Sequence, residues 1–240
     1  MSGHSKWANI KHKKERSDAK KGKAFTKIGR ELALAIRQGG PDPDKNSKLK
    51  DAIAKAKANN MPNDTIKRSI SKAIGEGNQD NYEEFLYEGH GPHGVACIVE
   101  VRTDNRNRAA AYIRHAFDKY GGSLGTTGCV SFMFERKGVI IIENKEEIDE
   151  DTLMMEALEG GAQDFIAEEE FFEVLTEVAD FSNVREALEQ KGYEFLEVSL
   201  QRIPSTYVKL NEEDQKLMEK LIDNLEDSDD VQNIYHNWEL

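Results

Sequence analysis

The segment GVIIIENKEEIDEDTLMMEALEGGAQDFIAEEEFFEVLTEVADFSNVREALEQKGYEFLEVSLQRI, residues 138–203, decides the fold class of this chain. Short apolar runs, typical of strands, alternate in it with longer stretches whose apolar residues recur every three or four positions, as in helices. The pattern predicts a strand, a helix, two strands, a helix and a strand, at 138–143, 150–159, 164–169, 172–178, 181–191 and 193–203. Six elements in the order β-α-β-β-α-β form a complete ferredoxin-like unit.

The residues on either side of this segment carry two halves of the same pattern. Before it, the sequence predicts a strand, a helix and a strand: VACIVEVR (95–102), RNRAAAYIRHAFDKYGG (106–122) and CVSFMFE (129–135). After it, the same order returns: STYVKL (205–210), a helix at 212–226 and VQNIYHNW (231–238). We therefore expect a split ferredoxin-like domain formed by 81–135 and 204–240, with a second one inserted at 136–203. One large mixed sheet is the competing arrangement.

Residues 1–80 predict a basic arm and a helical domain. Apolar residues at three- and four-residue spacing predict three helices: one with Phe25, Ile28, Leu32 and Ile36, one with Leu49, Ile53 and Ala56, and one with Ile66, Ile70 and Ile74. Glycine and proline at 39–41 and glycines at 75 and 77 mark helix ends. The expected fold class is α+β, an N-terminal three-helix domain followed by two ferredoxin-like α/β domains, one inserted in the other.

The charge reverses sign along the chain. The formal net charge is -12, yet residues 1–80 hold nineteen Lys/Arg and nine Asp/Glu, a net charge of +10, and residues 81–240 carry -22. The first thirty residues alone hold ten basic and two acidic side chains. A basic segment of this density on an acidic body indicates a polyanionic partner that meets one end of the chain. A solvated basic helix that only keeps the chain soluble is the alternative.

The residues expected to bind nucleic acid are basic side chains of this end and one aromatic. Lysines make point-charge contacts to phosphates, and a tryptophan can stack on an unpaired base. Packing of the tryptophan on the helical domain is the alternative. The set is Lys6, Trp7, Lys11, Lys13, Lys14, Arg16, Lys20, Lys21, Lys23, Lys27 and Arg30, continued on the helical domain by Lys67 and Arg68.

Several motifs together resemble the YebC/PmpR family: MSGHSKWANIKHKK at the start, GKAFTKIGREL, ANNMPNDTI, YEGHGPHG, TDNRNR and GGSLGTTGCVSFMF. The resemblance covers essentially the whole chain and is densest in residues 2–135. That family includes bacterial proteins and the mitochondrial translational activator of cytochrome oxidase subunit one. The resemblance implies a helical domain and two α/β domains, one inserted in the other.

The resemblance also implies a function. The family is usually described as cytoplasmic transcriptional regulators that bind DNA, and members are also described as translation factors that engage the ribosome and ease elongation through consecutive prolines. No helix-turn-helix, zinc finger or basic zipper is legible, and the acidic body would repel a long duplex. We expect a nucleic-acid-binding regulator of gene expression, with DNA as the first partner and ribosomal RNA as the alternative. The sequence gives neither a target gene nor the oligomeric state.

The motif GHGPHG at 89–94 predicts a stiff contact loop ahead of a core strand. Its glycines and proline would restrict the tip, so that it could touch RNA or protein. A turn that needs glycine only for its backbone conformation is the alternative. The candidate contact residues are His90, Gly91, Pro92 and His93.

The motif TDNRNR at 103–108 predicts a helix N-terminus. Asp104 or Asn105 is expected to cap the helix, which places Arg106 and Arg108 in its first turn. The helix dipole disfavours cations there, so we expect an anion to bind nearby.

The remaining motifs favour a protein that is not an enzyme and that holds no cofactor or metal. The glycine-rich stretch at 121–128 precedes a strand and lacks the lysine of a P-loop. His90, His93 and Cys97 lack a fourth metal ligand, and two cysteines without a CxxC indicate reduced, cytosolic thiols. No apolar run approaches the roughly 20 residues of a membrane span. We therefore expect a cytoplasmic protein with no membrane or small-molecule partner.

Overall fold

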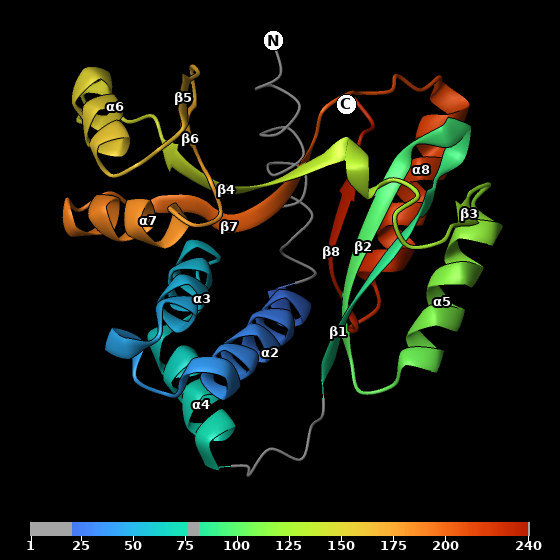
Figure 1. Ribbon diagram of the computed structural model, residues 1–240, viewed down its shortest axis with the longest axis horizontal. Helices are drawn as coiled ribbons and strands as arrows, with labels where there is room; N and C mark the ends of the chain where they lie inside the picture. The colour runs from blue at the N-terminus through green and yellow to red at the C-terminus, as the bar shows by residue number, and fades with distance from the viewer. Residues whose placement is uncertain (1–20, 76–81, 240) are drawn as a thin grey trace. The chain divides into compact units, whose positions relative to one another are not determined.

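The computed structural model of the chain describes residues 21–75 and 82–239. The fold class is α+β as predicted, with an N-terminal helical domain and two four-stranded sheets that carry helices (Figure 1). The chain divides into two compact units. Unit 1 combines Met1–Gly77 with Arg136–Gln201, and unit 2 combines Asn78–Glu135 with Arg202–Leu240. None of the helices in the described part is long and apolar enough to cross a membrane.

The helical part of unit 1 contains the three predicted helices, α2 (Lys21–Gly39), α3 (Ser47–Ala58) and α4 (Asn63–Gly75). Leu32 and Leu49 are fully buried in their shared core, beside Ile66. The predicted burial of the apolar stripe is wrong for one residue, since Ile74 is 55% exposed. It lies in the last turn of α4, beyond the part of the helix whose Ile66 and Ile70 contact the core.

A buried asparagine fixes the corner between α2 and α3. The side-chain nitrogen of Asn46 donates to the carbonyl oxygens of Ala35 and Gly40, both at 2.8 Å. Its side-chain oxygen accepts the Leu49 N–H at 3.1 Å and so caps α3. One side chain therefore satisfies backbone groups at the end of α2 and at the start of α3.

The inserted residues of unit 1 form the predicted ferredoxin-like unit. Its elements are β4 (Phe134–Glu143), α6 (Glu150–Glu159), β5 (Asp164–Ala167), β6 (Phe171–Thr176), α7 (Phe181–Gln190) and β7 (Phe195–Pro204). The sheet order is β5-β6-β4-β7, so the first and third strands lie in the middle. Ile140 and Phe172 of the sheet pack with Leu153 of α6 and Leu188 of α7 in one buried cluster.

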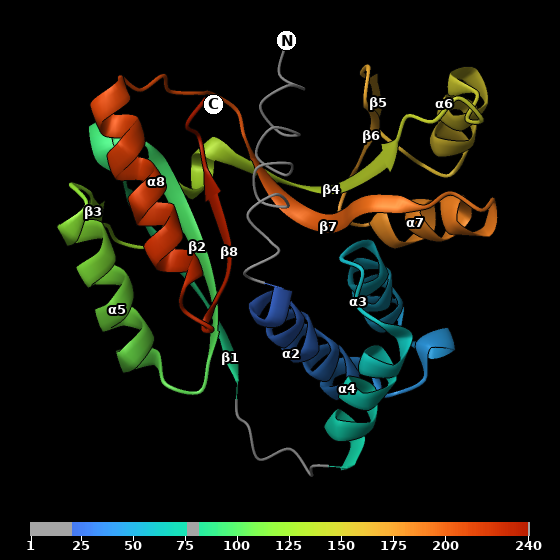
Figure 2. The ribbon, with the colours of Figure 1, turned by 180° about the vertical axis from the view of Figure 1, so that it is seen from behind.

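The helical domain is docked on this inserted domain inside unit 1. Ala54 and Ala58 of α3 belong to the core cluster of the inserted sheet and its helices, and their small side chains allow α3 to approach α7 closely. Helix α3 is therefore buried on two faces, one toward α2 and α4 and one toward α7 (Figure 2).

A buried ion pair joins the two helices. Arg185 of α7 is 1% exposed, and its Nε donates to Oδ1 of Asp51 at 3.0 Å. The Ser182 hydroxyl donates to the other Asp51 oxygen at 2.6 Å, and Arg185 Nη1 donates to Glu189 at 2.8 Å. Burial raises the pKa of Asp51 above its ordinary 3.8, while the Ser182 hydrogen bond and the Arg185 charge oppose that rise. Lys50 adds a salt bridge to Glu186 at 3.0 Å.

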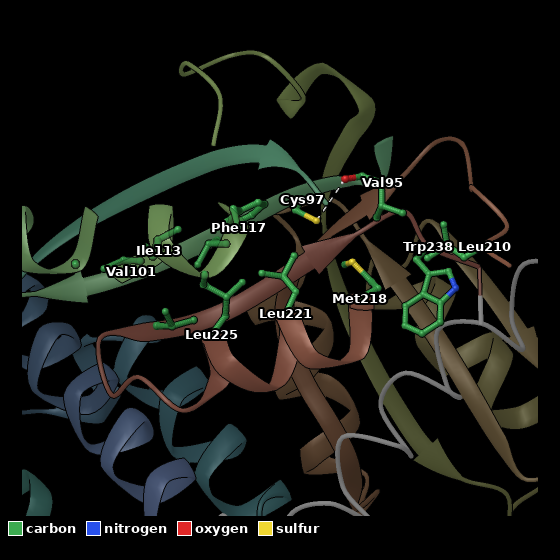
Figure 3. Packing of buried hydrophobic residues seen from close by; sticks show 14 residues of the cluster. Val95, Cys97, Val101, Ile113, Phe117, Leu210, Met218, Leu221, Leu225 and Trp238 are labelled. Carbon is green, nitrogen blue, oxygen red and sulfur yellow. Dashed lines mark hydrogen bonds between the residues drawn. The ribbon is translucent and has the colours of Figure 1, made fainter. Parts of the chain in front are cut away.

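Unit 2 is a two-layer sandwich. Its elements are β1 (Glu83–His90), β2 (Ala96–Thr103), α5 (Arg106–Lys119), β3 (Ser123–Leu124), α8 (Glu212–Glu226) and β8 (Val231–His236). The sheet order is β3-β1-β2-β8, and α5 and α8 cover one face (Figure 1). Figure 3 shows Val101 of β2 and Ile113 and Phe117 of α5 packed with Leu221 and Leu225 of α8.

Two strand predictions in unit 2 are wrong. Residues 129–133 do not form a strand: Ser131–Met133 is a 3-10 turn, and the strand begins only at Phe134. The backbone N–H groups of this region bond to the carboxylate of Glu88 and not to a neighbouring strand. Residues 205–210 contribute a single bridge, between Val208 and Trp238. Strand β1, which the sequence patterns did not single out, pairs along its whole length with β2 in a hairpin. The two strands take the inner positions of the sheet.

Replacing Asp51 by alanine should destabilise the protein more than replacing an exposed partner of the same interface. Asp51→Ala leaves the Nε of the buried Arg185 guanidinium without its carboxylate and Glu189 as the remaining ion-pair partner, so we expect a loss of roughly 2–4 kcal/mol in the free energy of unfolding. Lys57→Ala removes the more exposed Lys57–Glu189 bridge and should cost less than about 1 kcal/mol. Urea denaturation of both variants measures the difference, and equal losses would contradict the importance of the buried pair.

Candidate nucleic-acid interface

Three basic residues of α2 lie on one side of the helix. Lys23, Lys27 and Arg30 recur at four- and three-residue spacing, opposite the buried Leu32. All three side chains are partly exposed. The described helical residues 21–75 hold thirteen Lys/Arg and five Asp/Glu, so this domain keeps a strongly positive charge.

The clearest unpaired cations of the helical domain are on α4. Lys67 and Arg68 are exposed, whereas the preceding Ile66 is buried in the three-helix core. Within the described part of the chain, neither side chain forms a hydrogen bond or ion pair. Both are therefore available to an external anion without breaking an internal contact.

The predicted residues of the arm lie outside the described residues. They are Lys6, Trp7, Lys11, Lys13, Lys14, Arg16 and Lys20. Lys21 is the first residue of α2.

The two arginines at the start of α5 have partners in the protein itself. Asn105 caps the helix by accepting the Arg108 N–H at 3.0 Å. The Arg108 guanidinium donates to Asp230 at 2.8 Å and to Asp104 at 2.8 Å, and these hydrogen bonds raise its pKa. The guanidinium of Arg106 lies 4.9 Å from the ring centre of Phe85, a cation–π contact. The anion expected at this helix start is therefore supplied, for Arg108, by two carboxylates of unit 2.

The GHGPHG loop is partly buried against the protein and partly exposed. Gly91 and Pro92 are buried, and a Cβ at Gly91 would lie 2.9 Å from the Met218 sulfur of α8. His93 is exposed and has a positive φ of 53°, which is uncommon for a residue other than glycine. The loop therefore docks on α8 through its glycine and proline, and its two histidines, His90 and His93, are exposed. The Nδ1 atom of His93 lies 3.7 Å from the Asp214 carboxylate of α8.

A second loop, residues 125–131, is organised by a buried carboxylate. Glu88 of β1 is 4% exposed, and its two oxygens accept the N–H groups of Gly128 at 2.8 Å, Val130 at 3.0 Å and Ser131 at 2.8 Å. Burial works to raise the pKa of Glu88, but these backbone donors outweigh it and hold the pKa below its ordinary 4.5. A glycine-rich loop that resembles an anion cradle thus already holds an anion of its own chain.

Two residues of this region were missed by the sequence analysis. Glu88 was not singled out by any sequence pattern, and only the folded loop shows why a carboxylate is buried there. Phe132 follows the loop and is 80% exposed, the most exposed large apolar side chain of the described residues. The alternation of CVSFMFE had suggested an ordinary strand position for it.

The chain was compared with known proteins. Residues 5–76 match the family model described as the TACO1/YebC protein N-terminal domain, and residues 82–238 match the model of the TACO1/YebC second and third domain. A protein of Acetivibrio thermocellus named "Probable transcriptional regulatory protein" is 64% identical over 239 residues, 99% of each chain. A protein of Ruminiclostridium cellulolyticum with the same name is 61% identical and covers all of this chain and 97% of its own.

A solved structure has a similar fold. The crystal structure of a conserved hypothetical protein, Aq1575, from Aquifex aeolicus matches with a TM-score of 0.80 and 42% sequence identity. The match covers 92% of this chain and 91% of that one. The likeness therefore extends over both units.

Replacing Glu88 by glutamine should destabilise unit 2 in a pH-dependent way. The amide group would turn N–H donors toward backbone N–H groups, so we expect a loss of roughly 1–3 kcal/mol at pH 7. Because the folded pKa lies below the ordinary 4.5, the carboxylate stabilises the fold above that value and loses its effect as pH falls through the folded pKa. Urea denaturation of wild type and Glu88→Gln at several pH values measures this. The stability difference should shrink in acid, and a difference independent of pH would contradict the role of the charge.

Proposed function

Because the chain belongs to the TACO1/YebC family, we propose that it is a nucleic-acid-binding regulator of gene expression. The observation that carries the proposal is the positive charge of the helical domain. Residues 21–75 hold thirteen basic and five acidic side chains, although the net charge of the whole chain is -12. Phosphate groups are the partner that such a surface fits best. The protein acts by binding and not by catalysis, in the cytoplasm, without cofactor or metal.

In this proposal, the phosphate contacts to the partner come from the arm and from helices α2 and α4. Lys67 and Arg68 are exposed and unpaired within the described residues, and Lys23, Lys27 and Arg30 line one side of α2. Arg106 at the start of α5 adds a cation whose guanidinium already lies over an aromatic ring. Arg108 contributes less in this proposal, because two carboxylates hold its guanidinium.

A transcriptional regulator that binds DNA is the first candidate. The relatives of 64% and 61% identity are named probable transcriptional regulatory proteins. Contacts of lysine and arginine to phosphates would position this protein on a duplex without reading its sequence.

A ribosome-associated translation factor is the second candidate, and the charge distribution favours it. Residues 81–240 carry a net charge of -22, which repels a long duplex beyond the contacts of the basic end. A ribosome offers RNA to the basic end and protein surfaces to the acidic remainder. On a ribosome the acidic residues could contact protein surfaces, whereas on a long DNA duplex they would only repel the phosphates.

The deciding experiment compares the two partners at the same, near-physiological salt concentration. Purified protein is sedimented with ribosomes and, in parallel, titrated onto random and genomic duplex DNA. Stoichiometric co-sedimentation with weak DNA binding supports the translation factor. Tight binding to one DNA sequence without ribosome association supports the transcriptional regulator.

Neutralising the arm should weaken binding to either partner. In a variant with Lys11, Lys13, Lys14 and Arg16 all replaced by glutamine, we expect affinity to fall by about tenfold or more, because up to four phosphate contacts are lost. Unchanged binding by this variant would remove the arm from the interface.

The double variant Lys67→Gln/Arg68→Gln tests the described part of the surface. Each lost phosphate contact lowers the slope of log affinity against log salt by about 0.7–0.9, so the slope should fall by up to about 1.8. Lys216→Gln/Lys220→Gln is the matched control, since these exposed lysines lie on α8 of the acidic unit 2. Equal salt slopes in both double variants would show that α4 makes no phosphate contact.

A further inference from the structure

Phe132 is held outward by a rigid backbone. The N–H of the preceding Ser131 is fixed on Glu88, and Val130 before it is fully buried. On the other side, the Met133 carbonyl accepts the Ser205 N–H at 2.9 Å and the Ser205 hydroxyl at 3.1 Å. The backbone on both sides of the ring is therefore anchored. Binding of a partner to the ring should cost little entropy for ordering the loop.

The exposure of this ring is exceptional in the protein. Phe132 is 80% exposed, whereas the other exposed large apolar side chains of the described residues range from 37% to 59% and none is aromatic. A phenylalanine this exposed stabilises the fold little, because most of its apolar surface stays in water. The loop that carries it is nevertheless built around a buried carboxylate with three backbone donors. That construction is understandable if the ring meets a partner.

The segment that leads to the ring is polar and uncharged, and the exposed Glu135 and Arg136 follow it. Residues 121–134 contain no Asp, Glu, Lys, Arg or His, although 32% of the whole chain is charged. Exposed hydroxyls of Thr126 and Thr127 precede the ring, and strand pairing places Ser123 opposite the exposed His90. The anchor residues of protein–protein interfaces are normally enclosed by further apolar contacts. A flat exposed ring that follows a segment of hydroxyls and glycines better fits the face of a nucleobase.

We propose that Phe132 is a stacking platform for an unpaired nucleobase of RNA or single-stranded DNA. The inference rests on the proposed function, because the affinity of the basic helical domain supplies most of the binding. It adds a binding preference to that function. A base inside a duplex is already stacked on both sides, so the ring increases the affinity for single-stranded segments only.

The test compares three fluorescent oligonucleotides: oligo(rA), oligo(dA) and a random duplex. Each has about twelve nucleotides per strand, which is within the range of about 4–16 nucleotides that a single-strand-binding domain can cover. Phe132→Ala should weaken binding of single strands by roughly 5- to 100-fold, the range for loss of one stacked base. Binding of the duplex should stay unchanged, and so should the salt slope of every complex, because no phosphate contact is lost. Phe132→Trp should restore single-strand binding. Comparison of oligo(rA) with oligo(dA) distinguishes RNA from DNA as the source of the base.

Controls separate stacking from folding and from general loss of apolar surface. Met155→Ala removes an exposed apolar side chain of α6, 59% exposed, and should leave all three affinities unchanged. Single strands bound equally by wild type and Phe132→Ala would overturn the stacking role alone. Loss of ribosome co-sedimentation by Phe132→Ala without any change in oligonucleotide binding would also overturn it and assign the ring to a protein contact. Failure of the wild type to bind any of the three would overturn the proposed function, and the stacking role with it.

Discussion

The contact between Arg185 and Asp51 is the constraint on which the arrangement of unit 1 depends. A guanidinium that is 1% exposed cannot remain without a carboxylate, because the desolvation of an unpaired buried charge costs several kcal/mol. The two residues lie on helices of different domains, 134 positions apart in the chain. Alanines at 54 and 58 bring α3 close enough for the pair to form. The result is that the basic helical domain and the acidic inserted domain fold as one compact unit.

Unit 2 uses the same principle with backbone donors in place of a side chain. Glu88 is buried in the sheet and collects three N–H groups from the loop that crosses its open face. The carboxylate thereby shapes the loop into a 3-10 turn, where the sequence had predicted a strand. The same bonds place Phe132 in solvent. In both units, therefore, a buried ionised group determines how a neighbouring segment is held, and the exposed surface follows from that.

The charge of the chain is understandable in these terms. The positive helical domain keeps Lys67 and Arg68 free of internal partners in the described residues, whereas α3 uses Lys50 and Lys57 to bind the acidic α7. Lysines of the same domain thus have two different roles. Lys50 and Lys57 of α3 stabilise the contact with α7, whereas Lys67 and Arg68 of α4 are exposed. The remainder of the chain is acidic, with a net charge of -22 over residues 81–240.

The sequence by itself determined the fold class, since apolar periodicity and glycine or proline stops depend on local chemistry. The three helices of the N-terminal domain and the β-α-β-β-α-β order at 138–203 follow from it, as does the sign reversal of the charge. Tertiary structure decided what depends on residues distant in the chain. The second buried face of α3, the partners of Arg108, the place of β1 in its sheet and the burial of Glu88 are of this kind. A charged residue in a sequence is typically solvated, and only the folded chain shows which one has lost its water and gained a partner.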